Sequence, residues 1–123
     1  MYQIENLSFS FPNQKEVLKN ISLEIKNGEF LVICGVSGCG KTTLLKHLKP
    51  SLTPAGQKSG NIIFDDLIKE DIKIGYVAQN PENQIVMNTV WHEIAFGLEN
   101  QNTPLKQMKR RVGEIVNYFN LQD

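Results

Sequence analysis

The feature that most constrains this chain is a glycine-rich segment, residues 35–42, that joins two apolar stretches. Its sequence, Gly-Val-Ser-Gly-Cys-Gly-Lys-Thr, fits the pattern G-x-x-x-x-G-K-S/T without a mismatch. Residues 30–34, just before it, are apolar without interruption, which is typical of a strand covered on both faces of a parallel α/β sheet. The leucines that follow it predict a helix that ends near Pro50. The sequence therefore predicts a strand–loop–helix unit of the α/β class.

The residue types in this loop indicate that it binds phosphate. Glycines allow the backbone to curl so that successive N–H groups point inward, toward phosphate oxygens. The ammonium group of Lys41 can place a positive charge on the β and γ phosphates of a nucleotide, and the hydroxyl of Thr42 can ligate Mg²⁺. With glycine near 7% of residues, we expect a chance match in roughly 1% of chains this size. The alternative is an ordinary glycine-rich turn.

The composition argues against two kinds of partner. The 123 residues suit one domain, and 13 basic residues balance 13 acidic ones, so we expect no attraction to nucleic acid. No apolar run approaches the roughly 20 residues that span a bilayer, and polar residues interrupt the start of the chain where a signal peptide would be apolar. We therefore expect any contact with a membrane to go through a partner protein.

The cysteines and histidines give no sign of a metal site. Cys34 and Cys39 are too few for a disulfide framework, which favours a reducing cytosol. We expect Cys34 to be buried at a strand end, and Cys39, inside the loop, to be shielded from a maleimide by bound nucleotide. His47 and His92 have no cysteine or histidine at metal-ligand spacing, so we predict no functional role for either.

Alternation of apolar and polar residues predicts further strands on both sides of the loop. Residues 7–11 and 21–25 alternate in this way, and the out-of-step position of Ile4 predicts a bulge near Glu5 and Asn6. The other predicted features of this part are a turn at Pro12-Asn13, a hairpin turn at Asn27-Gly28, a loop over residues 51–60, and strands at residues 62–64 and 72–77.

Two amphipathic helices are predicted to close the chain. Thr89 can cap the first, and Thr103-Pro104 starts the second, with proline at the first helical position. Phe96 falls nearly opposite the apolar stripe of the first helix, so it is a candidate for docking a partner, or simply an exposed apolar residue. The predicted stripes are Val90, Trp91, Ile94, Ala95 and Leu98 in the first helix, and Leu105, Met108, Val112, Ile115, Val116 and Phe119 in the second.

Three segments in this order resemble the ATP-binding-cassette (ABC) ATPases. Residues 4–43, which include the alternating strands and the loop, look like the start of that family's nucleotide-binding domain. Residues 75–81, Gly-Tyr-Val-Ala-Gln-Asn-Pro, resemble its Q-loop, and Ala78 stands where an aromatic residue is more usual. Residues 83–86 and 89–97 resemble the ATPases of energy-coupling-factor importers, which take up vitamins or transition-metal ions.

This resemblance implies a fold and a set of site residues. The expected fold is a P-loop α/β domain: an antiparallel β subdomain and an incomplete parallel core sheet with helices in residues 1–80, then the start of a helical subdomain in residues 81–123. Phe11 is implied to stack on adenine, where tyrosine is more frequent in the family, although a core role for Phe11 stays open. Gln79 is implied to contact Mg²⁺ and the attacking water. The residues expected to hold MgATP are Phe11, Gly35, Ser37, Gly38, Cys39, Gly40, Lys41, Thr42 and Thr43.

The family's domain is about twice this long, and three of its later motifs are not found in this sequence: the Leu-Ser-Gly-Gly-Gln signature, the Walker B strand and the switch histidine. We therefore expect little or no ATP turnover by this chain alone. The resemblance implies part of an importer's ATP-binding subunit, in the cytoplasm at the inner face of the membrane. Its implied partners are a transmembrane subunit and a second ATPase subunit, and other subunits select the substrate. The alternatives are a non-catalytic nucleotide-binding remnant and a soluble ABC protein of translation or repair.

Overall fold

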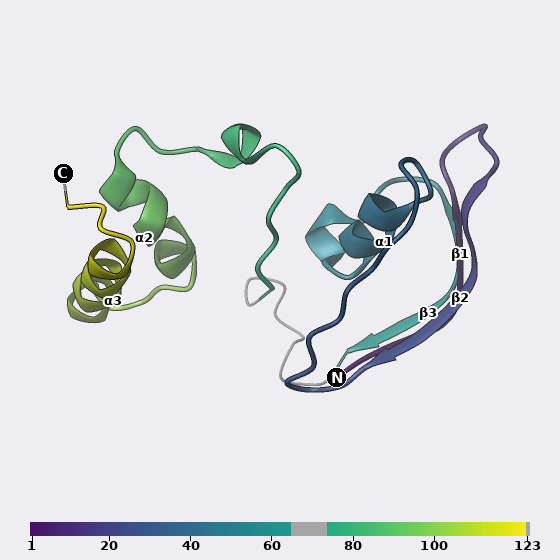
Figure 1. Ribbon diagram of the computed structural model, residues 1–123, viewed down its shortest axis with the longest axis horizontal. Helices are drawn as coiled ribbons and strands as arrows, with labels where there is room; N and C mark the ends of the chain where they lie inside the picture. Colours follow the sequence, from purple (N-terminus) through teal and green to yellow (C-terminus); the bar gives the residue numbers. More distant parts are fainter. Residues whose placement is uncertain (65–73, 123) are drawn as a thin grey trace. The chain divides into compact units, whose positions relative to one another are not determined.

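The computed structural model describes residues 1–64 and 74–122 of the chain. The chain forms two compact units, Met1–Ile74 and Gly75–Asp123. The first unit contains the sheet and helix α1, and the second contains helices α2 and α3 (Figure 1).

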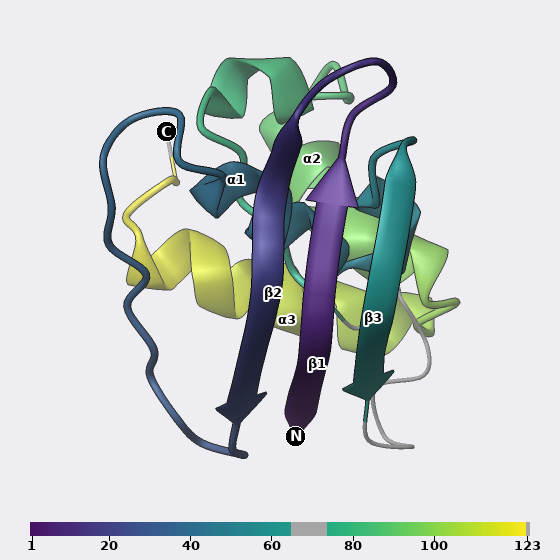
Figure 2. The ribbon, with the colours of Figure 1, turned by 90° about the vertical axis from the view of Figure 1, so that its right-hand side faces the viewer.

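The first unit is built on a three-stranded antiparallel sheet. Strand β1 (Tyr2–Ser10) lies in the centre, with β2 (Glu16–Ile25) on one side and β3 (Gln57–Phe64) on the other (Figure 2). The β1–β2 pair is joined by a turn in which the backbone N–H of Gln14 donates to the carbonyl of Phe11 at 3.1 Å. Asn13 in this turn has a φ of 57°, which asparagine tolerates better than most residues. The predicted turn at Pro12-Asn13 is therefore confirmed.

A bulge interrupts β1 at the place that the sequence predicts. The register of β1 against β2 shifts between Ile4 and Leu7, and Asn6 has a φ of 48°. The backbone N–H of Asn6 is satisfied by the Ser22 hydroxyl of β2, at 3.0 Å. Opposite the bulge, a Cβ on Gly60 would collide with the carbonyl oxygens of Glu5 and Asn6, so this position of β3 needs glycine. The bulge thus shapes all three strands.

One face of this sheet is covered by helix α1 (Lys41–His47), which is followed by the short 3₁₀ helix η1 (Pro50–Leu52) (Figure 1). The side chains that meet between the sheet and the helix are buried and apolar, and burying each contributes about 1.5–3 kcal/mol. This first core consists of Ile4, Leu7 and Phe9 from β1, Leu18 from β2 and Leu44 from α1. It fixes the helix, and therefore the loop that precedes it, against the sheet.

The second unit has a smaller core between two helices. Helix α2 (Val90–Asn100) packs against α3 (Leu105–Tyr118) through Ala95, Met108 and Val112, and the 3₁₀ helix η4 (Pro81–Gln84) precedes them. The hydroxyl of Thr89 accepts a hydrogen bond from the backbone N–H of His92 at 3.3 Å, which confirms the predicted cap. Four predicted stripe residues, Trp91, Ile94, Leu98 and Val116, pack around this core.

The predicted strand at residues 30–34 is wrong for this structure. The segment has no strand hydrogen bonding, and the exposed fractions of Phe30 and Val32 are 91% and 64%. A strand covered on both faces needs strands beside it and helices over it, and among the described residues no strand pairs with this segment. Cys34, predicted to be buried, is exposed for the same reason. The sheet formed by the described residues is entirely antiparallel.

Other sequence predictions are wrong in part. Of the predicted strand at 72–77, residues 72 and 73 lie outside the described residues, and residues 74–77 form no strand. Strand β3 begins at Gln57, inside the predicted loop. The turn at Asn27-Gly28 exists, with Gly28 at a φ of 77°, but no strand follows it to make a hairpin.

The helices also differ in detail from the predictions. Pro104 is the residue before α3 rather than the first helical residue, because its ψ of 139° is extended. Four predicted stripe residues are exposed because the contact between α2 and α3 is narrower than the apolar stripes: Val90, Leu105, Ile115 and Phe119.

Candidate functional site

The glycine-rich loop leads directly into α1, and its lysine folds back over it. Lys41 is the first residue of α1, and its Nζ donates hydrogen bonds to the carbonyl oxygens of Gly35 at 2.7 Å and Val36 at 2.8 Å. Two charge-assisted hydrogen bonds hold the ammonium group against the backbone of the loop. The loop therefore carries a positive charge at a defined position.

Two glycines give the loop its curl. Gly38 and Gly40 have φ values of 78° and 101°, in the left-handed region that glycine adopts without strain. Gly40 also approaches β2 closely, because a Cβ there would lie 3.0 Å from Val17 Cγ1 and 3.2 Å from Leu18 Cδ2. The end of the loop is thus seated on the sheet at the point where α1 begins.

The other loop residues are open to solvent. The side chains of Ser37, Cys39 and Thr42 are exposed, and Thr43 is half-buried. Cys39 Sγ lies 3.6 Å from Lys41 Nζ, and a Cβ on Gly35 would lie only 2.6 Å from this sulfur. The structure therefore brings the predicted phosphate-binding residues together in one loop, with their polar groups accessible.

Phe11 lies in the same unit as the loop and has a partly buried ring. It packs against the first core and meets Phe9 edge to face, with ring centroids 5.0 Å apart and planes at 84°. Its backbone is held by the turn that separates β1 from β2. The core packing and the implied adenine contact are compatible, because Phe11 is only half-buried.

Gln79 belongs to the second unit, and its side chain is exposed. The segment around it is shaped by Gln84, whose Oε1 accepts from the backbone N–H of Ala78 at 2.9 Å and whose Nε2 donates to the Tyr76 carbonyl at 3.1 Å. Sequence reasoning missed this role of Gln84. The available clue was that a glutamine side chain can both donate to a backbone carbonyl and accept from a backbone N–H group. Gln79 and the glycine-rich loop therefore belong to different units.

Glu93 is a second residue that sequence reasoning missed. Its Oε2 accepts hydrogen bonds from the backbone N–H groups of Val86 at 3.0 Å and Met87 at 2.7 Å. The available clue was an acidic residue in the first turn of a helix capped by threonine. Glu93 thus ties the segment before α2 to the helix itself.

No metal centre is evident within the described part of the chain. Residues 1–64 and 74–122 hold no group of three or more histidine, cysteine, aspartate or glutamate side chains that could hold a metal ion. His47 is buried, whereas His92 is exposed, with Nδ1 2.6 Å from Thr89 Oγ1. Over the same residues, no helix combines the length and apolar character needed to cross a bilayer.

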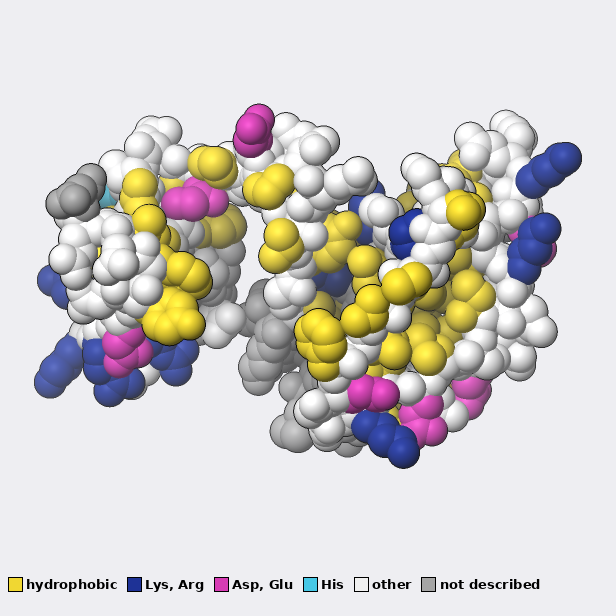
Figure 3. All heavy atoms as spheres, in the orientation of Figure 1, with side chains coloured by type: hydrophobic (Ala, Val, Ile, Leu, Met, Phe, Trp, Pro, Cys, Tyr) yellow, Lys and Arg dark blue, Asp and Glu magenta, His cyan; other side chains and the backbone are white. Residues whose placement is uncertain are grey.

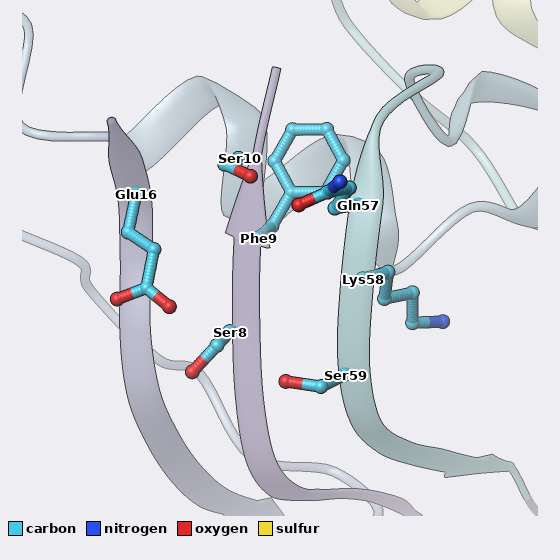
Figure 4. A pocket seen from close by; sticks show the side chains of 7 residues that line it. All are labelled: Ser8, Phe9, Ser10, Glu16, Gln57, Lys58 and Ser59. Atoms are coloured by element: carbon cyan, nitrogen blue, oxygen red, sulfur yellow. The ribbon is translucent and has the colours of Figure 1, made fainter. Parts of the chain in front are cut away.

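The first unit has two further surface features. A hollow of about 180 Å³ on the sheet is lined mainly by polar side chains (Figure 4). Figure 3 shows hydrophobic side chains gathered on the visible face of the first unit, and the exposed apolar residues of that unit include Phe30, Val32 and Val36. The lining of the hollow is Ser8, Phe9, Ser10, Glu16, Gln57, Lys58 and Ser59.

A small antiparallel sheet, a glycine-rich loop ending in Lys-Thr, and a helix that starts at this lysine define a P-loop class of protein. Comparison with known proteins identifies the family. The family model described as ABC transporter matches residues 18–123, and the chain belongs to this family. Its fold is that of the amino-terminal portion of an ABC ATPase.

Individual relatives agree with this assignment. A putative ABC transporter ATP-binding protein of Bacillus thuringiensis is 44% identical, in a match that covers 98% of this chain and 23% of that protein. An energy-coupling factor transporter ATP-binding protein (EcfA1) of Fusobacterium nucleatum is 45% identical, with 89% and 43% covered. The chain thus spans less than half the length of each of these relatives.

A solved structure gives the same result for the fold. CbiO1 of Clostridium perfringens, described as part of the ABC transporter complex CbiONQ, superposes with a TM-score of 0.73 at 30% sequence identity. The match covers 94% of this chain and 49% of that protein. The predicted recognition, an ABC ATP-binding protein resembling the energy-coupling-factor subfamily, is confirmed.

Proposed function

We propose that this chain binds MgATP through its glycine-rich loop and works as part of the ATP-binding subunit of an importer. The observation that carries the proposal is the position of the Lys41 ammonium, 2.7 Å and 2.8 Å from two loop carbonyls. A cation held in this way forms a preorganised attraction for the β and γ phosphates, and little side-chain entropy is lost when they bind.

The other predicted site residues are proposed to bind the metal ion, the phosphates, the base and the attacking water. The exposed hydroxyl of Thr42 ligates Mg²⁺, and the loop N–H groups from Gly35 to Thr43 bind phosphate oxygens. The Phe11 side chain, which is half-buried, stacks on adenine. Gln79, with its exposed side chain, contacts Mg²⁺ and the attacking water. Without a further group to orient that water, the chain alone binds MgATP with little or no turnover.

The relatives' names support the proposed partners. EcfA1 is an energy-coupling factor transporter ATP-binding protein, and CbiO1 is part of a transporter complex. By analogy, the whole protein pairs with a second ATPase subunit and docks on a transmembrane subunit at the inner face of the membrane. The transported substrate is selected by other subunits. Phe96, which is half-buried and outside the contact between α2 and α3, stays a candidate for the docking surface.

The test is MgATP binding by the purified chain and by Lys41→Ala, followed by a phosphate-release assay. Because hydrogen bonds to charged groups contribute about 1.5–3 kcal/mol, we expect Lys41→Ala to bind at least about tenfold more weakly. Lys19→Ala, which removes an exposed lysine from β2, is the matched control and should bind like the wild type.

Each outcome is informative. Equal binding by Lys41→Ala, or no binding by a folded wild-type chain, would contradict the proposal. Turnover that Lys41→Ala abolishes would support nucleotide binding but contradict the expectation of an inactive chain, because it requires a catalytic base in addition to Gln79. Binding without turnover is also the behaviour of a nucleotide-binding remnant, so a coupled-transport assay with the whole protein separates the two.

A further inference from the structure

His47 is a buried polar side chain that the proposed nucleotide site leaves unexplained. It lies at the end of α1, and only 2% of its surface is exposed. Its Nδ1 lies 2.7 Å from the carbonyl oxygen of Thr43, one turn earlier in the helix. Because a carbonyl oxygen only accepts hydrogen bonds, Nδ1 carries the proton and donates it. His47 is thereby tied to a residue of the proposed phosphate site.

The other side of the His47 ring faces the sheet. It meets Phe9 of β1 edge to face, with ring centroids 4.6 Å apart and planes at 67°. Phe9 is itself buried and meets Phe11 in the same way, at 5.0 Å and 84°. Edge-to-face aromatic pairs have preferred geometries, so each ring constrains the orientation of the next. A continuous set of contacts therefore runs from Thr43 through His47 and Phe9 to Phe11.

Phe9 has little room to move independently of His47. A Cβ on Gly56, in the loop after η1, would lie 2.7 Å from Phe9 Cζ. This loop backbone therefore passes close against the ring. The Phe9 ring is contacted by the loop backbone at Gly56 and by the His47 ring. The orientation of Phe9 therefore depends on the side chain at position 47.

Packing alone does not explain a histidine at this position. Its Nε2 is buried and has no hydrogen-bond partner within the described part of the chain. Leaving a buried nitrogen unpaired is unfavourable, so a leucine of similar size would fill the space at lower cost. The feature that leucine would not reproduce is the pair of directional contacts, to the Thr43 carbonyl and to the Phe9 ring.

We propose that His47 is a positioning residue that sets the orientation of Phe11, through Phe9, relative to the phosphate-binding loop. The inference rests on the proposed function, in which Phe11 stacks on adenine and the loop holds the phosphates. His47 contributes to adenosine recognition and not to phosphate recognition.

The experiment compares two ligands, MgATP and magnesium tripolyphosphate, on the wild-type chain, His47→Leu and His47→Phe. From the energy of aromatic pairs, His47→Leu should weaken MgATP binding about three- to tenfold and leave tripolyphosphate binding unchanged. His47→Phe keeps an aromatic ring against Phe9 but loses the hydrogen bond to the Thr43 carbonyl, so it should restore part of the difference. The ratio of the two affinities is the readout, since a merely structural change would lower both.

A double-mutant cycle supplies the decisive control. In a Phe11→Leu background, where the stacking ring is gone, His47→Leu should cause no further loss of MgATP affinity. Additive losses would overturn the inference, as would an unchanged ratio in His47→Leu. If His47→Leu does not fold, His47→Met, which also lacks both the ring and the donor, replaces it with the same expected ratio. A folded wild-type chain that binds neither ligand contradicts the proposed function itself, and His47 then has no adenosine site to position.

Discussion

The ammonium group of Lys41 lies 2.7 Å from the carbonyl oxygen of Gly35, so the first residue of α1 is bonded to the first residue of the loop that precedes it. This contact, with the one to Val36, closes the loop on itself. The curvature of the loop is therefore maintained by the same side chain that is proposed to bind phosphate. Removal of Lys41 is expected to affect both the charge and the shape of the site.

The close contact between the end of the loop and β2 predicts that alanine substitutions at two loop glycines lower the stability by different amounts. Gly38 and Gly40 both have positive φ, so alanine costs about 1–2 kcal/mol of backbone strain at either position. Only at Gly40 would the added Cβ also crowd β2, 3.0 Å from Val17 Cγ1 and 3.1 Å from the Val17 carbonyl oxygen. Gly40→Ala should therefore lower the free energy of unfolding by about 1–3 kcal/mol more than Gly38→Ala, including an overpacking cost. Urea denaturation measures the difference.

Gly38→Ala is the matched control because a Cβ there meets no atom within 4 Å. Equal losses of stability in the two variants would show that crowding against β2 contributes nothing. The nucleotide affinity of Gly38→Ala is a separate readout, since this glycine curls the loop without touching the sheet.

The two cysteines predict a selective protection experiment. Both thiols are exposed, but Cys39 Sγ lies in the loop, 3.6 Å from Lys41 Nζ. A phosphate bound at Lys41 would cover Cys39, so MgATP should slow its reaction with a maleimide severalfold or more. Cys34 precedes the loop and should react at a rate that MgATP changes much less. Mass spectrometry of the labelled Cys34→Ser and Cys39→Ser variants gives the two rates separately.

The Lys41→Ala variant is the control for this experiment, because it should lose the protection while keeping both thiols. Labelling of Cys39 that is equally fast with and without MgATP, at concentrations where binding is measured, would contradict the placement of the phosphates over the loop.

Local features of the fold could be predicted from the sequence because they depend mainly on neighbouring residues. The turn at Pro12-Asn13 and the cap at Thr89 are set by side chains within a few positions, and the bulge at Asn6 shows in the local alternation of apolar residues although Ser22 and Gly60 complete it. The family assignment also followed from short motifs in a fixed order. The roles of Lys41 and the other loop residues stay predictions.

Features that depend on distant partners could not be predicted. The apolar run at residues 30–34 is typical of a buried strand, but a strand is buried only when other strands pair with it. Within residues 1–64 and 74–122 no strand pairs with this segment. The environment of His47 is another example, because its contacts join α1 to β1, and helical spacing alone gave no reason to place Phe9 beside it. Gln84 and Glu93 act on backbone N–H groups six or seven residues away, which a motif search does not examine.

The last prediction concerns Glu93 and the segment that leads from Gln79 into α2. Its carboxylate accepts two backbone hydrogen bonds, from Val86 and Met87, and within the described residues these two N–H groups have no other acceptor. Glu93→Ala should therefore raise the hydrogen-exchange rates of both amides by about tenfold, which corresponds to the loss of roughly 1.4 kcal/mol of protection. Glu93→Gln keeps an acceptor oxygen and should show a smaller increase. Amides that surround Ala95 in the core of α2 should exchange as in the wild type, because the cap at Thr89 is retained. Uniformly faster exchange over the whole helix would mean that Glu93 stabilises α2 itself rather than the segment before it.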